Sequence, residues 1–315
     1  MRVMLITNPF ATFTTPEGRD ALANTLDSRF QVDVEHTTHR GHAGELGARA
    51  AAEGYDAVVV HGGDGSVNEA TNGILGAPDR PRRNPADLPA LGVVPGGSAN
   101  VFARALGIDR DPLTATAQLM TLLDQRSRRS ISLGHTLNRW FLFNAGMGMD
   151  AIVVRQMEEL RAKGKKATAG LYFRTTLGAF FKPSITPPAF TVEVPDHEPI
   201  EGVRFGFVSN TGPWTYFGTR EIRTNPGTSF DTGLGIFAAT SIAVPRNLVL
   251  GGRLIAGTEP KASHLYRNDD VEWVRFTSPE PADVQMDGDY LGLYQNLEFG
   301  YRRAVLDVAA PAKAD

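Results

Sequence analysis

Two glycine-rich turns, each lying between an apolar run and a helix-like segment, constrain the fold of this chain more than any other feature. Residues 56–60 (DAVVV) run into residues 61–66 (HGGDGS), and residues 91–94 (LGVV) run into residues 95–100 (PGGSAN). Neighbouring parallel strands end at the same edge of a sheet, which is where sheets of this kind bind their ligands. The pair of turns therefore predicts an α/β fold with a ligand site at that edge.

The first turn combines a bendable backbone with a carboxylate. Asp64 lies among three glycines, Gly62, Gly63 and Gly65, which let the chain bend tightly and direct its N–H groups toward an anion. Ser66 is suited to cap the helix that follows. We interpret this segment as a phosphate-binding turn, although glycine turns after strands also serve as plain connections.

The composition favours a two-domain protein and narrows the classes of function. A chain of 315 residues with 42% apolar content is long enough to form two cores, and its formal net charge of −3 argues against a dedicated nucleic-acid binder. The absence of cysteine excludes disulfides and thiolate metal sites and is compatible with a reducing cytoplasm. No stretch approaches the roughly 18 apolar residues of a transmembrane helix. We therefore expect a cytoplasmic protein that is peripheral to a membrane at most.

The spacing of the strands divides the chain in two. Up to about residue 130, strand-like runs alternate with helical ones, which predicts an α/β nucleotide-binding domain with a parallel sheet over residues 1–130. Later strands follow one another closely, and this favours a second, antiparallel β-rich (sandwich) domain over residues 131–293. These later strands include residues 271–278 and 284–286, and helical insertions are expected near 150–163 and 169–180.

The two turns also resemble those of a known family. Residues 62–75 (GGDGSVNEATNGIL) and 95–108 (PGGSANVFARALGI) are similar to the signature loops of the diacylglycerol kinase catalytic-domain family, which includes bacterial lipid kinases and sphingosine and ceramide kinases. The resemblance implies ATP as phosphoryl donor and Mg²⁺ as cofactor. It also implies a nucleotide cleft between the two domains and a tail, about residues 294–315, that returns to the first domain.

Phosphoryl transfer needs a held triphosphate, a divalent cation and an aligned acceptor hydroxyl. By the resemblance, Asp64 orients Mg²⁺ or its waters, and Asn8-Pro9 matches the first nucleotide motif, although Phe10-Ala11-Thr12 replaces its usual Ser-Gly. The residues expected to bind the nucleotide are Asn8, Thr37, Thr38, Gly62, Gly63, Asp64, Gly65, Ser66, Glu69, Gly96, Gly97, Ser98, Asn100 and Asp289.

A third informative segment is residues 284–289 (VQMDGD). Taken alone, its Asp-Gly-Asp sequence is typical of a hairpin turn. The family has a DGE sequence here, whose first acid is proposed as the general base, so the resemblance implies that Asp287 accepts the proton of the lipid hydroxyl. The alternative makes Asp64 the catalytic base, as has been proposed for sphingosine-kinase relatives, and leaves Asp287 to shape a hairpin. Asp289 replaces the family's Glu and is one methylene shorter.

Two further features bear on metal binding. Residues 231–234 (DTGL) resemble a segment in which bacterial relatives bind a structural Mg²⁺, so Asp231 and the carbonyl of Leu234 are candidate ligands; an acidic turn before a strand is the alternative. Val101 stands where most bacterial members have Asp. The loss of that acid could alter lipid choice, metal handling or catalytic rate.

Residues 161–182 contain six basic side chains and no acid, interleaved with aromatic and aliphatic residues. This pattern fits either a surface that meets an anionic membrane or an ordinary docked helix with a solvated basic face. The expected partners are a lipid substrate in the membrane, the anionic membrane surface at its inner face and, in a homodimer, a second copy of the chain. No nucleic-acid partner is expected.

We therefore expect an ATP- and Mg²⁺-dependent lipid kinase that phosphorylates a hydroxyl of a diacylglycerol-like or sphingoid-like lipid. Two alternatives stay open at this point. An NAD kinase shares the GGDG turn and the first-domain fold, and a non-catalytic nucleotide- or lipid-binding protein could retain the fold without turnover.

Overall fold

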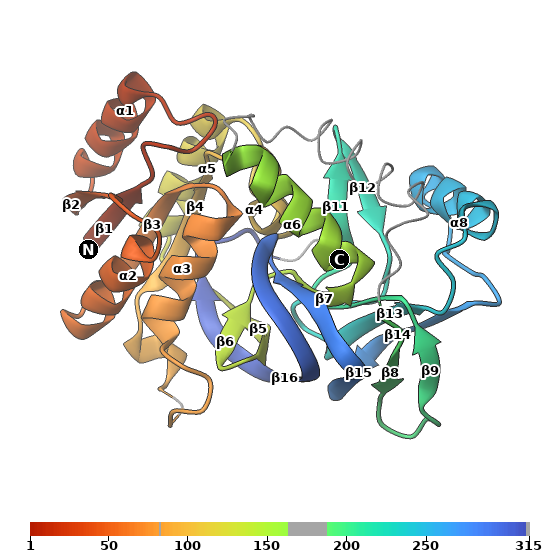
Figure 1. Ribbon diagram of the computed structural model, residues 1–315. Coiled ribbons are helices and arrows are strands. Elements are labelled where there is room, and N and C mark those ends of the chain that lie inside the picture. The colour runs from red at the N-terminus through yellow and green to blue at the C-terminus, as the bar shows by residue number, and fades with distance from the viewer. Residues whose placement is uncertain (82, 163–187, 313–315) are drawn as a thin grey trace. The chain divides into compact units, whose positions relative to one another are not determined.

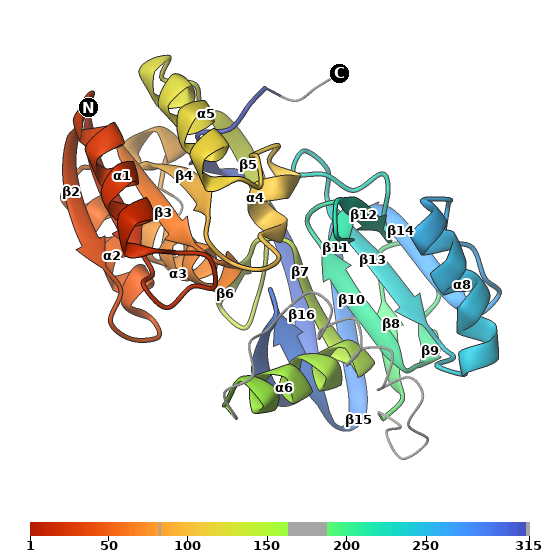
Figure 2. The same cartoon turned by 90° about the horizontal axis from the view of Figure 1, so that it is seen from above.

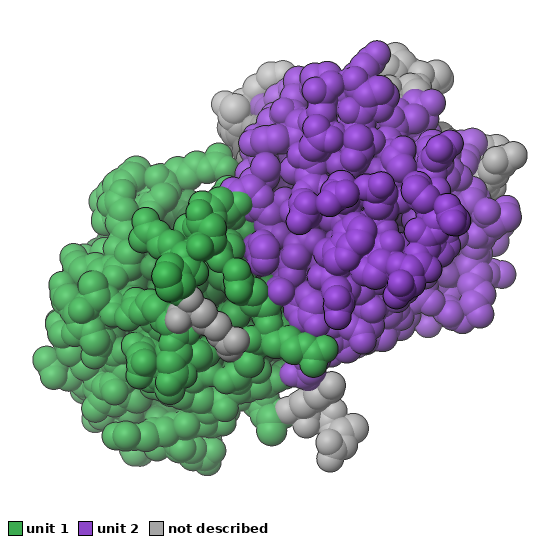
Figure 3. Space-filling view, turned by 90° about the horizontal axis from the view of Figure 1, so that it is seen from below, with its two compact units in different colours: residues 1–133, 138–140, 302–315 green, residues 134–137, 141–301 purple. Residues whose placement is uncertain are grey.

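The structure is a computed structural model that describes residues 1–81, 83–162 and 188–312. The chain forms two compact units, drawn in different colours in Figure 3. The first unit comprises residues 1–133, 138–140 and 302–315, and the second comprises residues 134–137 and 141–301. The tail joins the first unit from residue 302, later than the expected 294.

The first unit is an α/β unit built on a parallel sheet (Figure 1). Its elements are β1 (Arg2–Thr7), α1 (Pro16–Asp27), β2 (Gln31–His36), α2 (His42–Ala52), β3 (Ala57–Gly62), α3 (Asp64–Leu75), the 3₁₀ turn η1 (Pro85–Asp87), β4 (Ala90–Pro95), α4 (Val101–Ala105), α5 (Pro112–Asp124) and most of β5 (Arg129–Thr136). The strand order is β2-β1-β3-β4, and the end of β16 (Asp289–Val308) joins β4 in parallel through Val308 and Leu91.

Helices cover both faces of this sheet, with α1 and α5 on one face and α2 and α3 on the other (Figure 2). Every residue of β3 and β4 is buried as a result, which explains why both strands are apolar apart from His61 near the end of β3. Helices α2 and α3 approach so closely that a Cβ on Gly73 would lie 2.0 Å from the Gly44 carbonyl oxygen. Only glycine permits this contact, because the neighbouring atom belongs to the backbone.

The second unit is dominated by antiparallel strands. After β6 (Arg139–Phe141), at the boundary between the units, its elements are β7 (Asn144–Gly148), α6 (Met149–Ala162), β8 (Phe190–Glu193), β9 (Ile200–Val203), β10 (Phe205–Ser209), β11 (Pro213–Phe217), β12 (Arg220–Arg223), β13 (Leu234–Ala239), α8 (Val244–Ala256), β14 (Leu265–Val271), β15 (Trp273–Met286) and β16. The ladder runs β14-β13-β10-β7-β15-β16, β8 and β9 branch off at β15, and β11 pairs with β12. A core that includes Phe190, Phe276 and Phe299 packs on these strands.

The fold class expected from the sequence is confirmed, and three local expectations need comment. The run 284–286 and the run 271–278 from Trp273 onward form one long strand, β15, while Val271 ends β14. The register of β15 against β16 shifts between Thr277 and Ala282, where Pro279 and Pro281 cannot donate N–H bonds. Helix α8 was not expected from the sequence.

The expected helical insertion near 150–163 is α6, while the expected helix over residues 169–180 lies outside the described residues. Among the helices of the described ranges, none is both long and apolar enough to cross a membrane.

His61 at the end of β3 provides a test of this core. Its ring is buried, Nδ1 lies 3.2 Å from the Val94 carbonyl oxygen, and burial lowers the pKa of His61 below its usual 6.5. As the pH falls, the unfolded chain therefore binds a proton at His61 before the folded chain does. The unfolding free energy is consequently higher above about pH 6.5 and decreases below it.

We expect His61→Gln to reduce the loss of unfolding free energy between about pH 7.5 and about pH 5.5, measured by urea denaturation. The control is His197→Gln, because His197 is exposed in the second unit. An unchanged pH dependence in His61→Gln would contradict the assignment of the buried neutral ring.

Candidate nucleotide site

The first glycine turn lies where the strand order of the first unit reverses, between β1 and β3. Ligands of open α/β sheets bind at such a switch point, outside the carboxyl ends of the strands. The Asn8 N–H donates to the His61 carbonyl oxygen at 3.0 Å, and Asn8 Nδ2 donates to Ser66 Oγ at 2.9 Å. The structure thus brings the first predicted nucleotide motif onto the GGDG turn.

Helix α3 begins earlier than the sequence suggested. Gly63 is its N-cap residue, with an extended backbone (φ −88°, ψ 177°), and no side chain caps the helix. The expectation that Ser66 caps the helix was wrong, because Asp64 already has helical geometry and Ser66 lies within the first turn. The free N–H groups at this end therefore remain available to an anion.

The two glycine turns pack directly against each other. The Gly96 N–H donates to the Gly62 carbonyl oxygen at 2.9 Å. A Cβ on Gly97 would lie 2.6 Å from the Cα of Gly63, closer than real Cβ atoms come to backbone. The glycines are therefore required for the contact between the turns as well as for their bends.

The carboxylate of Asp64 joins the two turns chemically. Its Oδ2 accepts the Val101 N–H at 3.1 Å and its Oδ1 accepts the Phe102 N–H at 3.1 Å, at the start of α4. Burial raises the pKa of Asp64, while the backbone donors and the positive charge of Arg104 oppose this rise by stabilising the ionised form. The residue stays partly exposed. Since a carboxylate has about four acceptor positions, each oxygen can still take a further donor or a cation.

Other predicted residues shape the surrounding loops. Asn100 has a left-handed backbone (φ 49°), and its side chain accepts the Gly97 N–H at 2.9 Å and donates to the Gly97 carbonyl oxygen at 2.6 Å, which closes the second turn. Ser98 is exposed beside it. A Cβ on Gly65 would meet no atom within 4 Å, so this face of the first turn is open.

Three further predicted residues have partners at the end of β1 or at the amino end of α2. Glu69 Oε1 accepts the Gly41 N–H at 2.9 Å, at the start of α2. The buried Thr37 donates its N–H to the Thr7 carbonyl oxygen at 2.9 Å, and the Thr38 N–H donates to His42 Nδ1 at 3.1 Å. These contacts hold the loop after β2 in place, and a nucleotide-binding role for the three residues stays a prediction.

The residues of this edge fit the phosphates of a nucleotide and a hard cation. Open backbone N–H groups at the start of α3 suit phosphate oxygens, and the Asp64 carboxylate is the oxygen ligand that Mg²⁺ or its waters prefer. Val101 contributes only its N–H here, because its side chain is buried with 3% exposure.

Asp287 lies in the second unit at the tip of the β15–β16 hairpin. Asp287 and Gly288 both have positive φ (49° and 80°) between the paired Met286 and Asp289, as a tight hairpin turn requires. The buried carboxylate accepts three backbone N–H groups, from Leu142 at 2.6 Å, Phe143 at 2.9 Å and Asn144 at 3.1 Å. Asp287 therefore anchors the segment before β7, and its role as general base stays a prediction.

The second candidate metal segment precedes β13. Asp231 is exposed, whereas Leu234 is buried and pairs with Val271. The Gly233 N–H between them donates to Asp270 Oδ1 at 2.6 Å. Within the described ranges no group of three or more His, Asp or Glu side chains is placed to hold a metal ion. A structural Mg²⁺ at Asp231 and Leu234 stays a prediction, and the basic segment 161–182 lies almost wholly outside the described residues.

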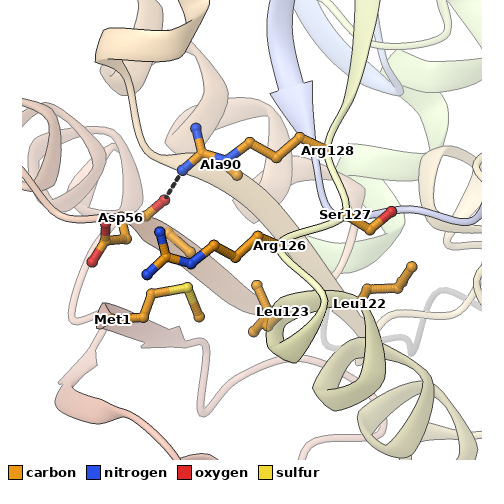
Figure 4. Close-up of a pocket in the computed structure, with 9 residues that line it drawn as sticks. Met1, Asp56, Ala90, Leu122, Leu123, Arg126, Ser127 and Arg128 are labelled. Carbon is orange, nitrogen blue, oxygen red and sulfur yellow. Dashed lines mark hydrogen bonds between the residues drawn. The ribbon is translucent and has the colours of Figure 1, made fainter.

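A small pocket occurs at the opposite edge of the parallel sheet. It is lined by residues at the amino ends of β1, β3 and β4 and by the turn after α5, where Arg128 Nη2 donates to the Asp56 carbonyl oxygen at 3.0 Å (Figure 4). Ligands of such sheets bind at the carboxyl ends instead, so we do not assign the nucleotide to this pocket.

The fold and the paired turns define an α/β unit with two linked glycine turns at its ligand edge, and sequence comparison shows which proteins it resembles. Residues 2–134 match the model of the diacylglycerol kinase catalytic domain. A diacylglycerol kinase of Bacillus subtilis (strain 168) is 34% identical over 131 residues, which are 40% of this chain and 40% of that protein. One of Staphylococcus aureus (strain JH9) is 34% identical over 129 residues, 41% of this chain and 37% of that protein. The first unit of the chain is therefore similar to the diacylglycerol kinase catalytic domain, and the chain aligns with about two fifths of the length of these relatives.

The fold likeness extends over the whole chain. A diacylglycerol kinase structure from Bacillus anthracis strain Sterne has a TM-score of 0.71 at 18% identity and matches 98% of this chain and 97% of its own. Another structure from the same strain has a TM-score of 0.75 at 21% identity, with the same coverage. At these identities the likeness concerns the fold, and it supports the same α/β and β-rich architecture.

We expect Gly97→Ala to separate the two turns, because the added methyl would overlap the backbone of Gly63. Overpacking of this kind costs roughly 1–3 kcal/mol, so the unfolding free energy should fall by that amount in a urea titration. Gly65→Ala is the matched control, since its methyl enters open space. Equal stabilities of the two variants would show that the turns do not depend on this contact.

Asp287→Asn separates a catalytic from a structural role. If Asp287 is the general base, kcat should fall by roughly 10²–10⁴ and the acidic limb of the pH–rate profile should disappear. If it only anchors the segment before β7, the profile should keep that limb, while the unfolding free energy falls by about 1–3 kcal/mol because a backbone donor loses its partner.

Proposed function

We propose that the chain is a lipid kinase that uses ATP and Mg²⁺ to phosphorylate a hydroxyl of a diacylglycerol-like or sphingoid-like lipid. The observation that carries this proposal is the pair of interlocked glycine turns, which Asp64 ties to the start of α4, within residues that match the model of the diacylglycerol kinase catalytic domain. The aligned part is about two fifths of each curated relative, so the activity of those proteins supports the proposal by analogy.

In this proposal the residues of the first unit bind and orient the donor. The N–H groups at the start of α3 hold phosphate oxygens, Asn8 and Asn100 fix the two turns, and Asp64 provides negative charge for the cation. When bound, Mg²⁺ would neutralise charge on the triphosphate. Asp287 is the proposed acceptor of the hydroxyl proton, and peripheral attachment to an anionic membrane would give access to the lipid.

The proposal competes with two alternatives. The GGDG turn alone suits an NAD kinase as well, but residues 95–108 and the Asp-Gly-Asp hairpin favour the lipid kinase. A non-catalytic binding protein is the second alternative, raised by Val101 and by the altered loop after Asn8. The product formed from labelled ATP distinguishes all three.

The direct test is a phosphorylation assay with labelled ATP and a panel of detergent-dispersed lipids, with NAD present as a competing acceptor. A labelled lipid supports the proposal, and labelled NADP would assign an NAD kinase. No transfer to either acceptor, with ATP still bound, would assign a binding protein.

Two variants test the donor site. Asp64→Asn should lower phosphoryl transfer at least about a hundredfold, because it removes the charge that faces the cation. Gly65→Ala should leave the unfolding free energy intact yet weaken ATP binding in calorimetry, since its methyl occupies the open face of the turn. Normal ATP affinity and turnover in both folded variants would exclude the first turn as the donor site.

A further inference from the structure

Helix α8 in the second unit presents an apolar stripe to solvent. Leu248 is 62% exposed, Val249 63% and Ile255 46%, and the exposed Gly252 and Ala256 complete the same face. The spacing of these five positions follows one side of a helix. An amphipathic helix on a water-soluble domain ordinarily turns this side to the core, so its outward position is unusual.

The stripe does not result from a loosely attached helix. Leu250 is 5% exposed and packs on Phe207 and Phe237, so that side of α8 lies against the sheet beside β13 and β14 (Figure 2). The Asn247 side chain donates to the Ser241 and Ala243 carbonyl oxygens, each at 3.0 Å, and fixes the amino end. Arg220 Nη1 donates to the Ile255 carbonyl oxygen at 2.7 Å near the other end. The helix is thus held with its apolar stripe outward.

The charge around the stripe identifies what could cover it. Residues 240–258 contain Arg246 and Arg253 and no acidic residue, although the chain as a whole has a net charge of −3. Glu259, which follows directly, is paired with Lys261 at 2.6 Å and with Arg267 at 2.8 Å, so basic charge still predominates at this end of the helix. Arg220 adds a third positive charge beside the carboxyl end of α8. An apolar face with basic neighbours is the combination that binds an anionic bilayer surface. At 13 residues, α8 would lie in the plane of the interface rather than cross it.

We propose that α8 is a membrane-docking helix, which inserts Leu248, Val249 and Ile255 among the acyl chains of an anionic bilayer while Arg220 and Arg253 lie near the lipid headgroups. The inference rests on the proposed function, since a kinase for a membrane lipid must reach its substrate at the bilayer. It places the membrane contact on a helix outside the basic segment 161–182.

The test measures flotation with vesicles of phosphatidylcholine alone and of phosphatidylcholine with phosphatidylglycerol. The wild type should bind the anionic vesicles more tightly, and less so at high salt. The triple variant Leu248→Gln, Val249→Gln, Ile255→Gln should lower the partition coefficient at least about tenfold. The control is Leu113→Gln, a singly exposed leucine on α5 (72% exposed). It should bind like the wild type.

Failure of the wild type to bind anionic vesicles, or equal binding by the triple variant, would overturn the inference. The inference would also be overturned if the wild type formed a dimer, the triple variant did not, and both bound vesicles equally. In that case a second copy of the chain would cover the stripe. Activity on detergent-dispersed lipid should be the same in the wild type and the triple variant. That arm tests the proposed function separately, since it needs no bilayer.

Discussion

The Asp64 carboxylate accepts two backbone N–H groups, and the arrangement of the ligand edge depends on this interaction. It ties the turn after β3 to the start of α4, so the two turns are held at a set distance. Hydrogen bonds to an ionised acceptor are stronger than those between neutral groups, and here they offset the cost of partial burial. The glycines remove the Cβ atoms that would otherwise keep the two backbones apart.

The second unit uses the same device with Asp287. This carboxylate also accepts consecutive backbone N–H groups, and it holds the segment before β7 against the tip of the β15–β16 hairpin. Asp64 and Asp287 are both predicted from the sequence to take part in catalysis, and both also accept hydrogen bonds that hold the backbone in place. A loss of activity after substitution therefore identifies a catalytic role only when the unfolding free energy and the pH–rate profile are measured beside it.

The sequence predicted the features that depend on local pattern. The alternation of strands and helices was sufficient for the fold class, which is confirmed. The two glycine turns were sufficient for the similarity to the diacylglycerol kinase catalytic domain, which residues 2–134 show. The partners of Asp64 could not be predicted, because Val101 and Phe102 donate through backbone groups that every residue type carries. Helix α8 was missed because Gly251 and Gly252 interrupt a segment whose apolar residues otherwise follow a helical period, and glycine disfavours a helix interior.

The same reasoning limits what the change to Val101 can mean. An acid at this position is absent, but the Val101 N–H still donates to Asp64 Oδ2, and the valine side chain is buried. The link between the two turns therefore does not require the missing carboxylate. What the substitution removes is one negative charge near the start of α4, and its effect should fall on cation affinity more than on the geometry of the turns.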